Sequence, residues 1–378
     1  MSHDPQVLYE QIAPHINAAL FDIPPPNAPS MYFPDRLNER LDNWFNRYQS
    51  GACQAIDAAI PFANGRTDVT LTKCRAMIDG IKSTVANYFM GDILEATQTF
   101  YQTMDDGFKD WAKLLNIPVG QVFFRARISD SEKHYERKDL FHLPFELRHL
   151  VATNRYSVPG FPALYLGDSA YVCWEEYDRH RLRDLTFAAF ENKRDVSVID
   201  INLFKEFNSE LSTATNPLYK IMDIMRYVCT YPLILACTCL VFEQKGSFKP
   251  EYIVPQLLLQ YVSQQSNVDG VKFPSSRINY GSLQNVKAYN YVFPVKTNAQ
   301  KGYCNCLKNV FDLTQPTSLE FEEVINNPMH LHGFIVGGDY PSDEPSIEVV
   351  RGVKSFYRDT SFGKIEGILK RRSFAALD

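Results

Sequence analysis

Apolar side chains recur every three or four residues through roughly the first 115 positions, which predicts a series of amphipathic helices. The block contains no cluster of polar groups suited to chemistry. We therefore interpret residues 1–117 as a helical accessory domain that regulates or oligomerises the protein, with Asp35 as the predicted N-cap of one helix. The three apolar faces are Leu37, Leu41, Trp44, Phe45 and Tyr48; Met77, Ile78, Ile81, Val85 and Phe89; and Ile93, Leu94, Phe100, Phe108, Trp111, Leu114 and Leu115.

The pattern changes after Ile117-Pro118-Val119-Gly120. Short apolar runs bounded by turn residues predict strands, and two longer apolar segments predict buried helices. The fold class is therefore α+β, with a mixed α/β domain at 118–300 and a C-terminal extension at 301–378 that packs on or completes it. The extension alternates strand-like runs, such as Phe334–Val336, with turns. The predicted strands are 122–124, 164–166, 185–190, 196–201, 271–273 and 289–293, and the predicted buried helices are 222–240 and 253–262.

Composition removes several classes of function. The net charge of -5 and the pI of about 5.9 argue against a nucleic-acid scaffold, which usually presents a basic face. No apolar run reaches the roughly eighteen residues that span a bilayer, and the N-terminus lacks the basic and apolar regions of a signal peptide. We expect a cytoplasmic protein with no membrane association, whose eight cysteines are reduced.

Short Cys and His motifs do not predict a metal site. Cys237-x-Cys239 and Cys304-x-Cys306 have one intervening residue, whereas structural zinc sites usually have two to four. His330-x-His332 has no acidic or thiol partner nearby in the sequence. We assign no metal, and we interpret the cysteines as packed or free thiols.

Three separated segments place polar groups where predicted strands end. In Phe123–Arg127, an arginine that emerges from an apolar strand is costly to bury unless it meets an anion. The segment from Asn154 to Glu176 combines a guanidinium, several phenols and a helix with adjacent carboxylates. In Asp269–Arg277 a predicted strand is followed by the hydroxyl groups of Ser275 and Ser276. Each segment alone has a structural explanation, but together they predict a nucleotide-sugar site, because arginine grips diphosphates and aromatic rings stack on heterocycles.

In their order and in their residues, these segments resemble the motifs of the RES family, which is named for its arginine, glutamate and serine. The resemblance covers roughly 123–294. Asn154 stands where the family usually has glycine, and the long gap between the glutamate and serine motifs indicates an insertion around 216–262. The helical block is similar to the extra domain of larger members. The matching positions are Phe124-Arg125; Arg155, Tyr156, Ser157, Gly160, Pro162 and Tyr165, followed by Ala170 through Glu176; and Asp269-Gly270-Val271 with Phe273-Pro274-Ser275.

The resemblance implies an ADP-ribosyltransferase-like fold, with NAD⁺ as a substrate and no bound cofactor. It implies that Arg125, Glu176 and Ser275 are catalytic. It also implies that NAD⁺ is bound by Arg155, Tyr156, Ser157 and Tyr165. Two ambiguities of register remain. Glu175 is an alternative to Glu176, because one helical position turns a side chain by roughly 100°, and Arg127 shares the strand face of Arg125.

The chemistry that the resemblance implies needs few groups. Nicotinamide in NAD⁺ is already cationic, so it leaves without a general acid and one carboxylate suffices, unlike the paired carboxylates of most glycosidases. The acceptor stays open: water gives a glycohydrolase, inorganic phosphate a phosphorylase, and a protein side chain an ADP-ribosyltransferase. The resemblance implies a bacterial toxin or defence effector that depletes NAD⁺, with an antitoxin or inhibitor protein that masks the site. A non-catalytic nucleotide-binding scaffold is the alternative of another class, and homo-oligomerisation is left open.

Overall fold

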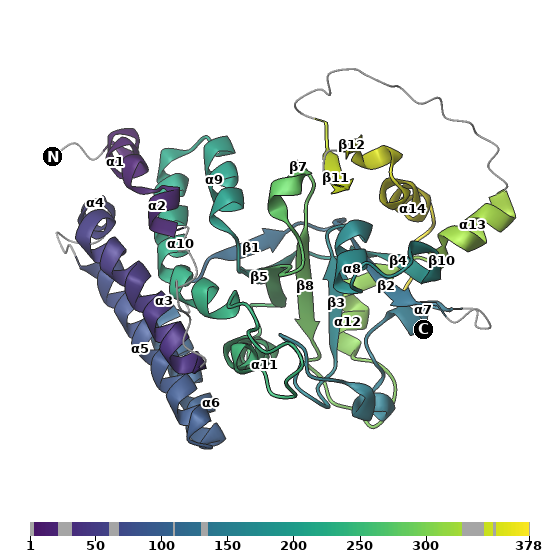
Figure 1. Cartoon of the computed structure of the whole chain (residues 1–378), viewed down its shortest axis with the longest axis horizontal. Coiled ribbons are helices and arrows are strands. Elements are labelled where there is room, and N and C mark those ends of the chain that lie inside the picture. The colour runs from purple at the N-terminus through teal and green to yellow at the C-terminus, as the bar shows by residue number, and fades with distance from the viewer. Residues whose placement is uncertain are drawn as a thin grey trace. The chain divides into compact units, whose positions relative to one another are not determined.

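Contacts divide the chain into two compact units that interleave along the sequence. The computed structural model describes residues 4–21, 32–59, 68–108, 110–129, 135–326, 344–350 and 353–377 (Figure 1). The first unit contains Met1–Leu115, Asn154–Tyr156 and Ile199–Val262, and the second contains Asn116–Thr153, Ser157–Val198 and Ser263–Asp378. These units differ from the predicted linear domains, because the segment 199–262 groups with the N-terminal helices. The extension at 301–378 falls within the second unit.

The first unit is helical. The long helices α5 and α6 run side by side (Figure 1), and α5 also packs against α3 and α10. The first two predicted apolar faces contribute to the core here, since Leu41 and Trp44 of α3 and Ile81 of α5 are fully buried. The third face was only partly right, because Ile93 and Leu94 are exposed. Its α-helices are α1 (Pro5–Ile12), α2 (Ala18–Phe21), α3 (Phe33–Arg47), α4 (Cys53–Ala58), α5 (Val69–Phe89), α6 (Ile93–Thr103), α9 (Phe204–Thr213), α10 (Pro217–Cys237) and α11 (Ile253–Gln264).

Two local predictions in the N-terminal block were wrong. Helix α3 begins at Phe33 with Tyr32 at the N-cap, so Asp35 lies in the first turn, where a negative charge favours the positive end of the helix dipole. Leu114 and Leu115, predicted to be helical, begin strand β1 (Leu114–Ile117). Short apolar runs fit either kind of element, so periodicity alone could not distinguish them.

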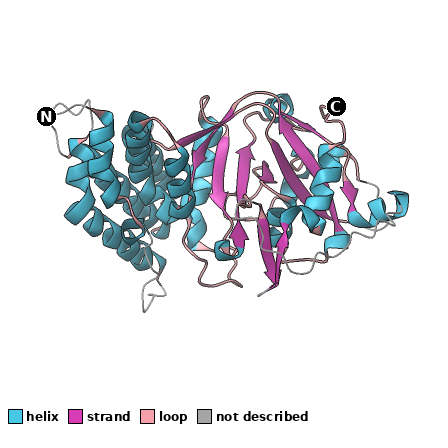
Figure 2. Ribbon diagram, turned by 90° about the horizontal axis from the view of Figure 1, so that it is seen from above, coloured by secondary structure: helices cyan, strands magenta, loops and turns pink. Residues whose placement is uncertain are grey.

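Most strand residues belong to the second unit, and Figure 2 shows the strands in magenta. Among the described residues, nine strands form one sheet in the order β1-β5-β6-β8-β3-β2-β4-β10, with β9 paired to β4. A smaller sheet has the order β12-β11-β7. The strands are β2 (Val122–Ile128), β3 (Ala163–Gly167), β4 (Leu185–Asn192), β5 (Val196–Asp200), β6 (Gly270–Pro274), β7 (Leu283–Gln284), β8 (Tyr289–Pro294), β9 (Phe311–Leu313), β10 (Thr317–Ser318), β11 (Ser346–Val350) and β12 (Val353–Phe356).

Helices of the second unit are short. Together with the sheets they confirm the α+β class and each of the six predicted strands, while α10 and α11 confirm the two predicted buried helices. Phe334–Val336 lies outside the described residues. The α-helices of this unit are α7 (Arg137–Leu140), α8 (Ala170–Glu176), α12 (Asn305–Val310), α13 (Leu319–Asn326) and α14 (Ser361–Lys370). Short 3-10 or π-helical segments are η1 (Ala13–His15), η2 (Tyr48–Ala52), η3 (Met104–Phe108) and η6 (Pro250–Tyr252) in the first unit, and η4 (Phe145–Leu150), η5 (Leu182–Asp184), η7 (Tyr280–Ser282) and η8 (Tyr357–Asp359) in the second.

One row of paired residues crosses four strands of the large sheet. Phe124 of β2 pairs with Gly167 of β3, Gly167 pairs with Asn290 of β8, and Asn290 pairs with Phe273 of β6. These pairings are antiparallel, so β3 and β6 end near this row and β8 begins there. The residues that follow β3 and β6 therefore meet the start of β8 at one edge of the sheet.

In the core of the second unit, α8 and α14 pack against one face of β2 and β4. Phe124 and Phe187 on the strands are buried with Tyr171 of α8 and Ile365 of α14. On the other face the ring of Phe123 contacts Tyr291 and Phe293, at centroid distances of 5.0 and 6.3 Å. None of the described helices is long and apolar enough to cross a membrane.

Candidate functional site

Helix α8 is fixed along a part of strand β2 that does not pair with β3. Seven residues of β2 pair with β4, but only Phe124 pairs with β3, so β3 diverges from β2 beyond that point. There, side chains towards the end of α8 donate hydrogen bonds to backbone carbonyls of β2. The Cys173 thiol donates to Phe124 O at 3.4 Å, and the Tyr177 hydroxyl donates to Ala126 O at 3.1 Å. The C-terminal end of α8 is thereby held beside β2.

The two adjacent carboxylates at the end of α8 have different environments. Glu175 is 3% exposed, and Arg179 donates to both of its oxygens, from Nε at 3.1 Å and from Nη2 at 2.9 Å. Tyr171 also hydrogen-bonds to Glu175, and burial followed by this bond raises the pKa of the Tyr171 hydroxyl. Glu175 is therefore neutralised within the fold, whereas the side chain of Glu176 is 38% exposed. This difference favours Glu176 as the carboxylate that can meet a ligand.

Glu176 is held by groups from the third predicted segment and from β8. Asn290 Nδ2 donates to Glu176 Oε1 at 2.6 Å, and Arg277 Nε lies 3.8 Å from Glu176 Oε2. Arg277 also forms an ion pair with Asp178. Tyr280 is close to the same carboxylate: burial raises the pKa of its hydroxyl, and the charge of Glu176 adds to that rise.

Arg125 is an arginine in an otherwise apolar strand, as the sequence predicted. Strand alternation places it on the face of Phe123, opposite Phe124. Its Nη1 is fully enclosed and has no hydrogen-bond partner among the described residues. Burial lowers the pKa of the guanidinium, and the nearby Tyr177 hydroxyl opposes that effect. An enclosed guanidinium nitrogen without an acceptor is costly, and an anion would satisfy it.

Arg125 and Glu176 both affect the pKa of the Cys173 thiol. Burial raises the pKa of the Cys173 thiol to about 12, Glu366 and Glu176 add to the rise, and Arg125 opposes it. Both charged groups are therefore close enough to act on one thiol of α8. Arg127 differs from Arg125, because it is exposed and its Nη1 donates to Asp139 O at 2.7 Å.

Ser275 directly follows β6, at the edge where β8 begins. It is 3% exposed, and its hydroxyl accepts the Arg277 N–H at 3.2 Å. Its own N–H donates to the Tyr280 hydroxyl at 2.9 Å, which in turn donates to Ala288 O at 2.8 Å. The predicted serine is thus in the same set of contacts as Arg277 and Tyr280, the two residues that adjoin Glu176.

The structure separates the second predicted segment between the two units. Arg155 belongs to the first unit, where its Nη1 donates to Cys237 O at 3.0 Å and Cys239 O at 2.9 Å and its guanidinium lies 5.3 Å from the Tyr252 ring centroid. Tyr156 is fully buried in that unit and lies near the Cys237 thiol, whose pKa burial raises to about 12. These contacts favour structural roles for both residues.

Ser157 and Tyr165 belong to the second unit. Their hydroxyl oxygens lie 2.7 Å apart, and Tyr165 is close enough to Arg125 for its charge to affect the Arg125 pKa. Of the seven predicted site residues, the second unit therefore contains Arg125, Ser157, Tyr165, Glu176 and Ser275.

Sequence reasoning missed Asn290, Arg277, Tyr280 and Asp168. Asp168 follows β3, and its Oδ2 accepts the Tyr289 N–H at 3.2 Å. Burial raises the pKa of this carboxyl, and Lys272 and Lys287 oppose the rise. A signal for Asn290 was present in the sequence, because it is the polar residue of the apolar run Tyr289–Pro294, as Arg125 is in its own strand.

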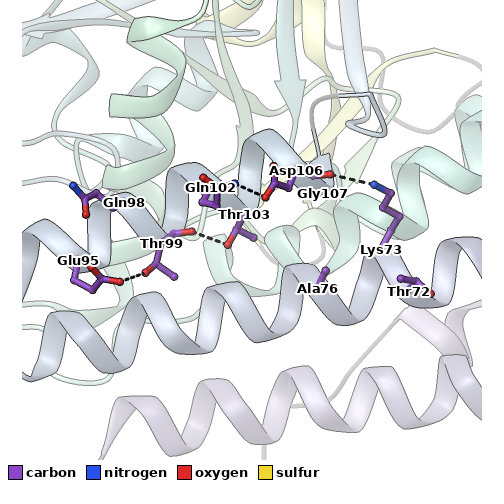
Figure 3. Close-up of a pocket in the computed structure, with 10 residues that line it drawn as sticks. All are labelled: Thr72, Lys73, Ala76, Glu95, Gln98, Thr99, Gln102, Thr103, Asp106 and Gly107. Carbon is purple, nitrogen blue, oxygen red and sulfur yellow. Dashed lines mark hydrogen bonds between the residues drawn. The ribbon is translucent and has the colours of Figure 1, made fainter.

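Other features of the described residues are less suited to chemistry. No group of three His, Cys, Asp or Glu side chains in the described ranges is placed to hold a metal ion, and His330-x-His332 lies outside those ranges. A hollow of about 560 Å³ lies along α5, α6 and the turn after α6 (Figure 3). Its polar groups bond to one another, as in Lys73 Nζ to Asp106 O at 3.1 Å and Thr103 Oγ1 to Thr99 O at 2.7 Å.

Comparison with known proteins places this arrangement in a family. The model of the RES domain matches residues 123–298, which contain Arg125, Glu176, Ser275 and Asn290. The chain is 32% identical over 323 residues to a Bacillus subtilis (strain 168) protein named "Putative toxin YopC", across 80% of this chain and 69% of that protein. No solved structure gives a significant match. The chain therefore belongs to the RES domain family, and its α+β fold is ADP-ribosyltransferase-like.

Proposed function

We propose that this protein is a toxin-like enzyme that cleaves the bond between nicotinamide and ribose in NAD⁺. The observation that carries the proposal is the contrast between the two carboxylates of α8. Glu175 is buried against Arg179, whereas Glu176 is exposed and held by a neutral amide, so its charge is available to a ligand. A carboxylate in that setting suits a reaction in which positive charge develops on a sugar ring.

Each residue has a role that its environment supports. Arg125 would bind a phosphate oxygen of NAD⁺, which would give its enclosed Nη1 an acceptor. Glu176 would bind a ribose hydroxyl and stabilise the oxocarbenium-like transition state. Ser275 would position the ribose or the acceptor, and Tyr165 and Ser157 would line the site. We give Arg155 and Tyr156 no part in binding, because the Arg155 guanidinium donates to carbonyls within the first unit and Tyr156 is fully buried there.

The bond changes need no metal ligand and no general acid. The C–N bond breaks with both electrons going to nicotinamide, which leaves as a neutral molecule. The ribose cation is then captured by water, which gives ADP-ribose and a proton, or by inorganic phosphate, which gives a phosphorylated ADP-ribose. Both acceptors stay open, because Arg277 beside Glu176 is also paired with Asp178 and adds no net positive charge that would select an anion. Protein ADP-ribosylation is the second candidate.

Other features of the proposal follow from the family. The relative in Bacillus subtilis is named a putative toxin, which supports a toxic action. NAD⁺ depletion as its means and control by an inhibitor protein are what the RES family resemblance implies, and they are part of the proposal. A scaffold that only binds nucleotides is the contrasting hypothesis. It would not need an exposed, oriented carboxylate, and it predicts binding without turnover.

Product analysis tests the proposal. Purified full-length protein, shown by mass spectrometry to carry no bound inhibitor, is incubated with NAD⁺ in phosphate-free buffer and in buffer containing phosphate. We expect nicotinamide in equal amount to the NAD⁺ lost, and a phosphorylated ADP-ribose that forms only in the buffer with phosphate would assign phosphate as the acceptor. Unchanged NAD⁺ in both buffers would refute the enzymatic proposal, and ADP-ribose alone in both would assign water as the acceptor.

A further inference from the structure

We propose that Asn290 is a positioning residue that fixes the Glu176 carboxylate in the orientation needed for cleavage; this inference rests on the proposed function. The observation is the 2.6 Å contact between Asn290 Nδ2 and Glu176 Oε1. A carboxylate can only accept hydrogen bonds, so the amide nitrogen must be the atom that faces it. The contact joins the first residues of β8 to the last residue of α8.

Asn290 is held more rigidly than the side chain that it contacts. It is 7% exposed, and its backbone pairs with Gly167 of β3 on one side and with Phe273 of β6 on the other. Glu176 is the last residue of a seven-residue helix, and its side chain is 38% exposed. A flexible, exposed carboxylate bonded to a fixed donor loses rotational freedom, which is how a neighbour preorganises a charged group.

The amide orients Glu176 without cancelling its charge. Arg179 forms a bidentate ion pair with Glu175 and so neutralises it, whereas Asn290 is neutral and engages only Oε1 of Glu176. Oε2 then remains for a ligand. Arg277 is the cation near it, but its Nε is 3.8 Å away and its Nη1 is paired with Asp178.

Other titratable groups close to Glu176 are few among the described residues. Arg277 comes from the segment after β6 and Asp178 from the turn after α8. The Tyr280 hydroxyl lies on η7, and the Cys173 thiol lies on α8 itself. Burial raises the pKa of both of these groups far above neutral pH, so they stay uncharged between pH 5 and 8. Asp168 also lies nearby, since it accepts the N–H of Tyr289, and burial raises the pKa of its carboxyl. Wild type has all of these groups, so a pH response that appears only relative to wild type reports the new group at position 290.

Two substitutions separate orientation from support of the fold. Asn290→Ala removes the donor, and we expect kcat to fall by roughly 10- to 100-fold with KM changed by less than about threefold, the range for loss of one hydrogen bond to a charged group. Asn290→Asp is nearly isosteric. Two carboxylates at this distance share one proton, so the introduced carboxyl group can donate to Glu176 when it is protonated at low pH but not when both groups are ionised. Activity of this variant, relative to wild type, should recover as pH falls from 8 to about 5.

Asn192 supplies a matched control. It is a fully buried amide on β4 of the same sheet, and its Nδ2 donates to the carbonyls of Ile117, Pro118 and Arg194. Asn192→Asp should lower the thermal unfolding temperature, with kcat per folded molecule unchanged and no recovery at low pH. Asn290→Ala should unfold within a few degrees of wild type.

The experiment measures nicotinamide release from NAD⁺ across pH 5–8 by wild type and the three variants, with thermal unfolding recorded for each. The proposal predicts a low-pH recovery that is confined to Asn290→Asp. It is overturned if folded Asn290→Ala has the kcat of wild type, or if the loss in Asn290→Asp is the same at every pH. An inactive wild type would instead refute the proposed function, so the two failures are distinguishable.

Discussion

Exchanging Glu176 and Glu175 for glutamine, one at a time, should give opposite results. Glutamine keeps the size of the side chain and removes the charge. At Glu176 the lost charge is the one that would stabilise the transition state, so we expect kcat to fall by about 10²–10³, equivalent to roughly 2.7–4 kcal/mol. Stability should change little, because the Glu176 side chain is 38% exposed and Asn290 can still donate to the amide oxygen.

At Glu175 the expected loss is in stability. Its two hydrogen bonds from Arg179, at 3.1 and 2.9 Å, join a buried carboxylate to a guanidinium that is 49% exposed. Hydrogen bonds to charged groups contribute about 1.5–3 kcal/mol when buried, and solvent around Arg179 weakens them, so we expect a cost of about 1–2 kcal/mol. Turnover per folded molecule should be within about threefold of wild type.

Nicotinamide release and urea unfolding, measured on the same preparations, test this contrast. The reasoning is refuted if Glu175→Gln abolishes turnover in a protein of unchanged stability while Glu176→Gln remains active. That outcome would move the functional carboxylate by one position and make the Arg179 ion pair a feature of the site.

Three further predictions concern Arg125, His142 and the helical block. Arg125→Lys should not restore the activity lost in Arg125→Ala, because lysine lacks the planar fork that grips a diphosphate, and full activity of the lysine variant would contradict this. Burial lowers the pKa of His142 from 6.5 to about 4, so the stability that depends on its neutral form is present above pH 6.5 and is lost as pH falls towards 4. In urea unfolding, wild type should lose about 3 kcal/mol more of its unfolding free energy over that pH range than His142→Asn does. Equal losses in the two proteins would contradict this prediction. Residues 118–378 alone should aggregate on size-exclusion chromatography, because deletion of α1, α3 and α5 exposes the buried face of α10, and a soluble fragment with cooperative unfolding would contradict it.

Local patterns predicted elements better than they predicted which elements pack together. Alternation and apolar runs were enough to place β2, β4 and β8, because each buries one or both faces. The grouping of 199–262 with the N-terminal helices depends on contacts between α10 and α5, which lie far apart in the sequence, and no local pattern encodes such contacts. The short strand β1 was missed because two adjacent apolar residues, Leu114 and Leu115, fit the end of a helix as well as the start of a strand.

The candidate site shows the same limit. The rule that a polar residue in an apolar strand needs a partner identified Arg125, and the same rule applied to 289–294 would have identified Asn290. Sequence reasoning could not show that Arg155, which lies in the second predicted segment, would direct its guanidinium to the carbonyls of Cys237 and Cys239. The choice between Glu175 and Glu176 required the position of Arg179, because both carboxylates fit the motif at sequence level.

The most direct test of the central claim is a stoichiometric NAD⁺ turnover assay on the full chain, with Glu176→Gln prepared in parallel. The protein is given a large excess of NAD⁺ without added metal, and nicotinamide is quantified over time. The account predicts many nicotinamide molecules released per wild-type chain and a rate lower by about 10²–10³ for Glu176→Gln. An absence of release from wild type, or release at equal rates from both proteins, would contradict it.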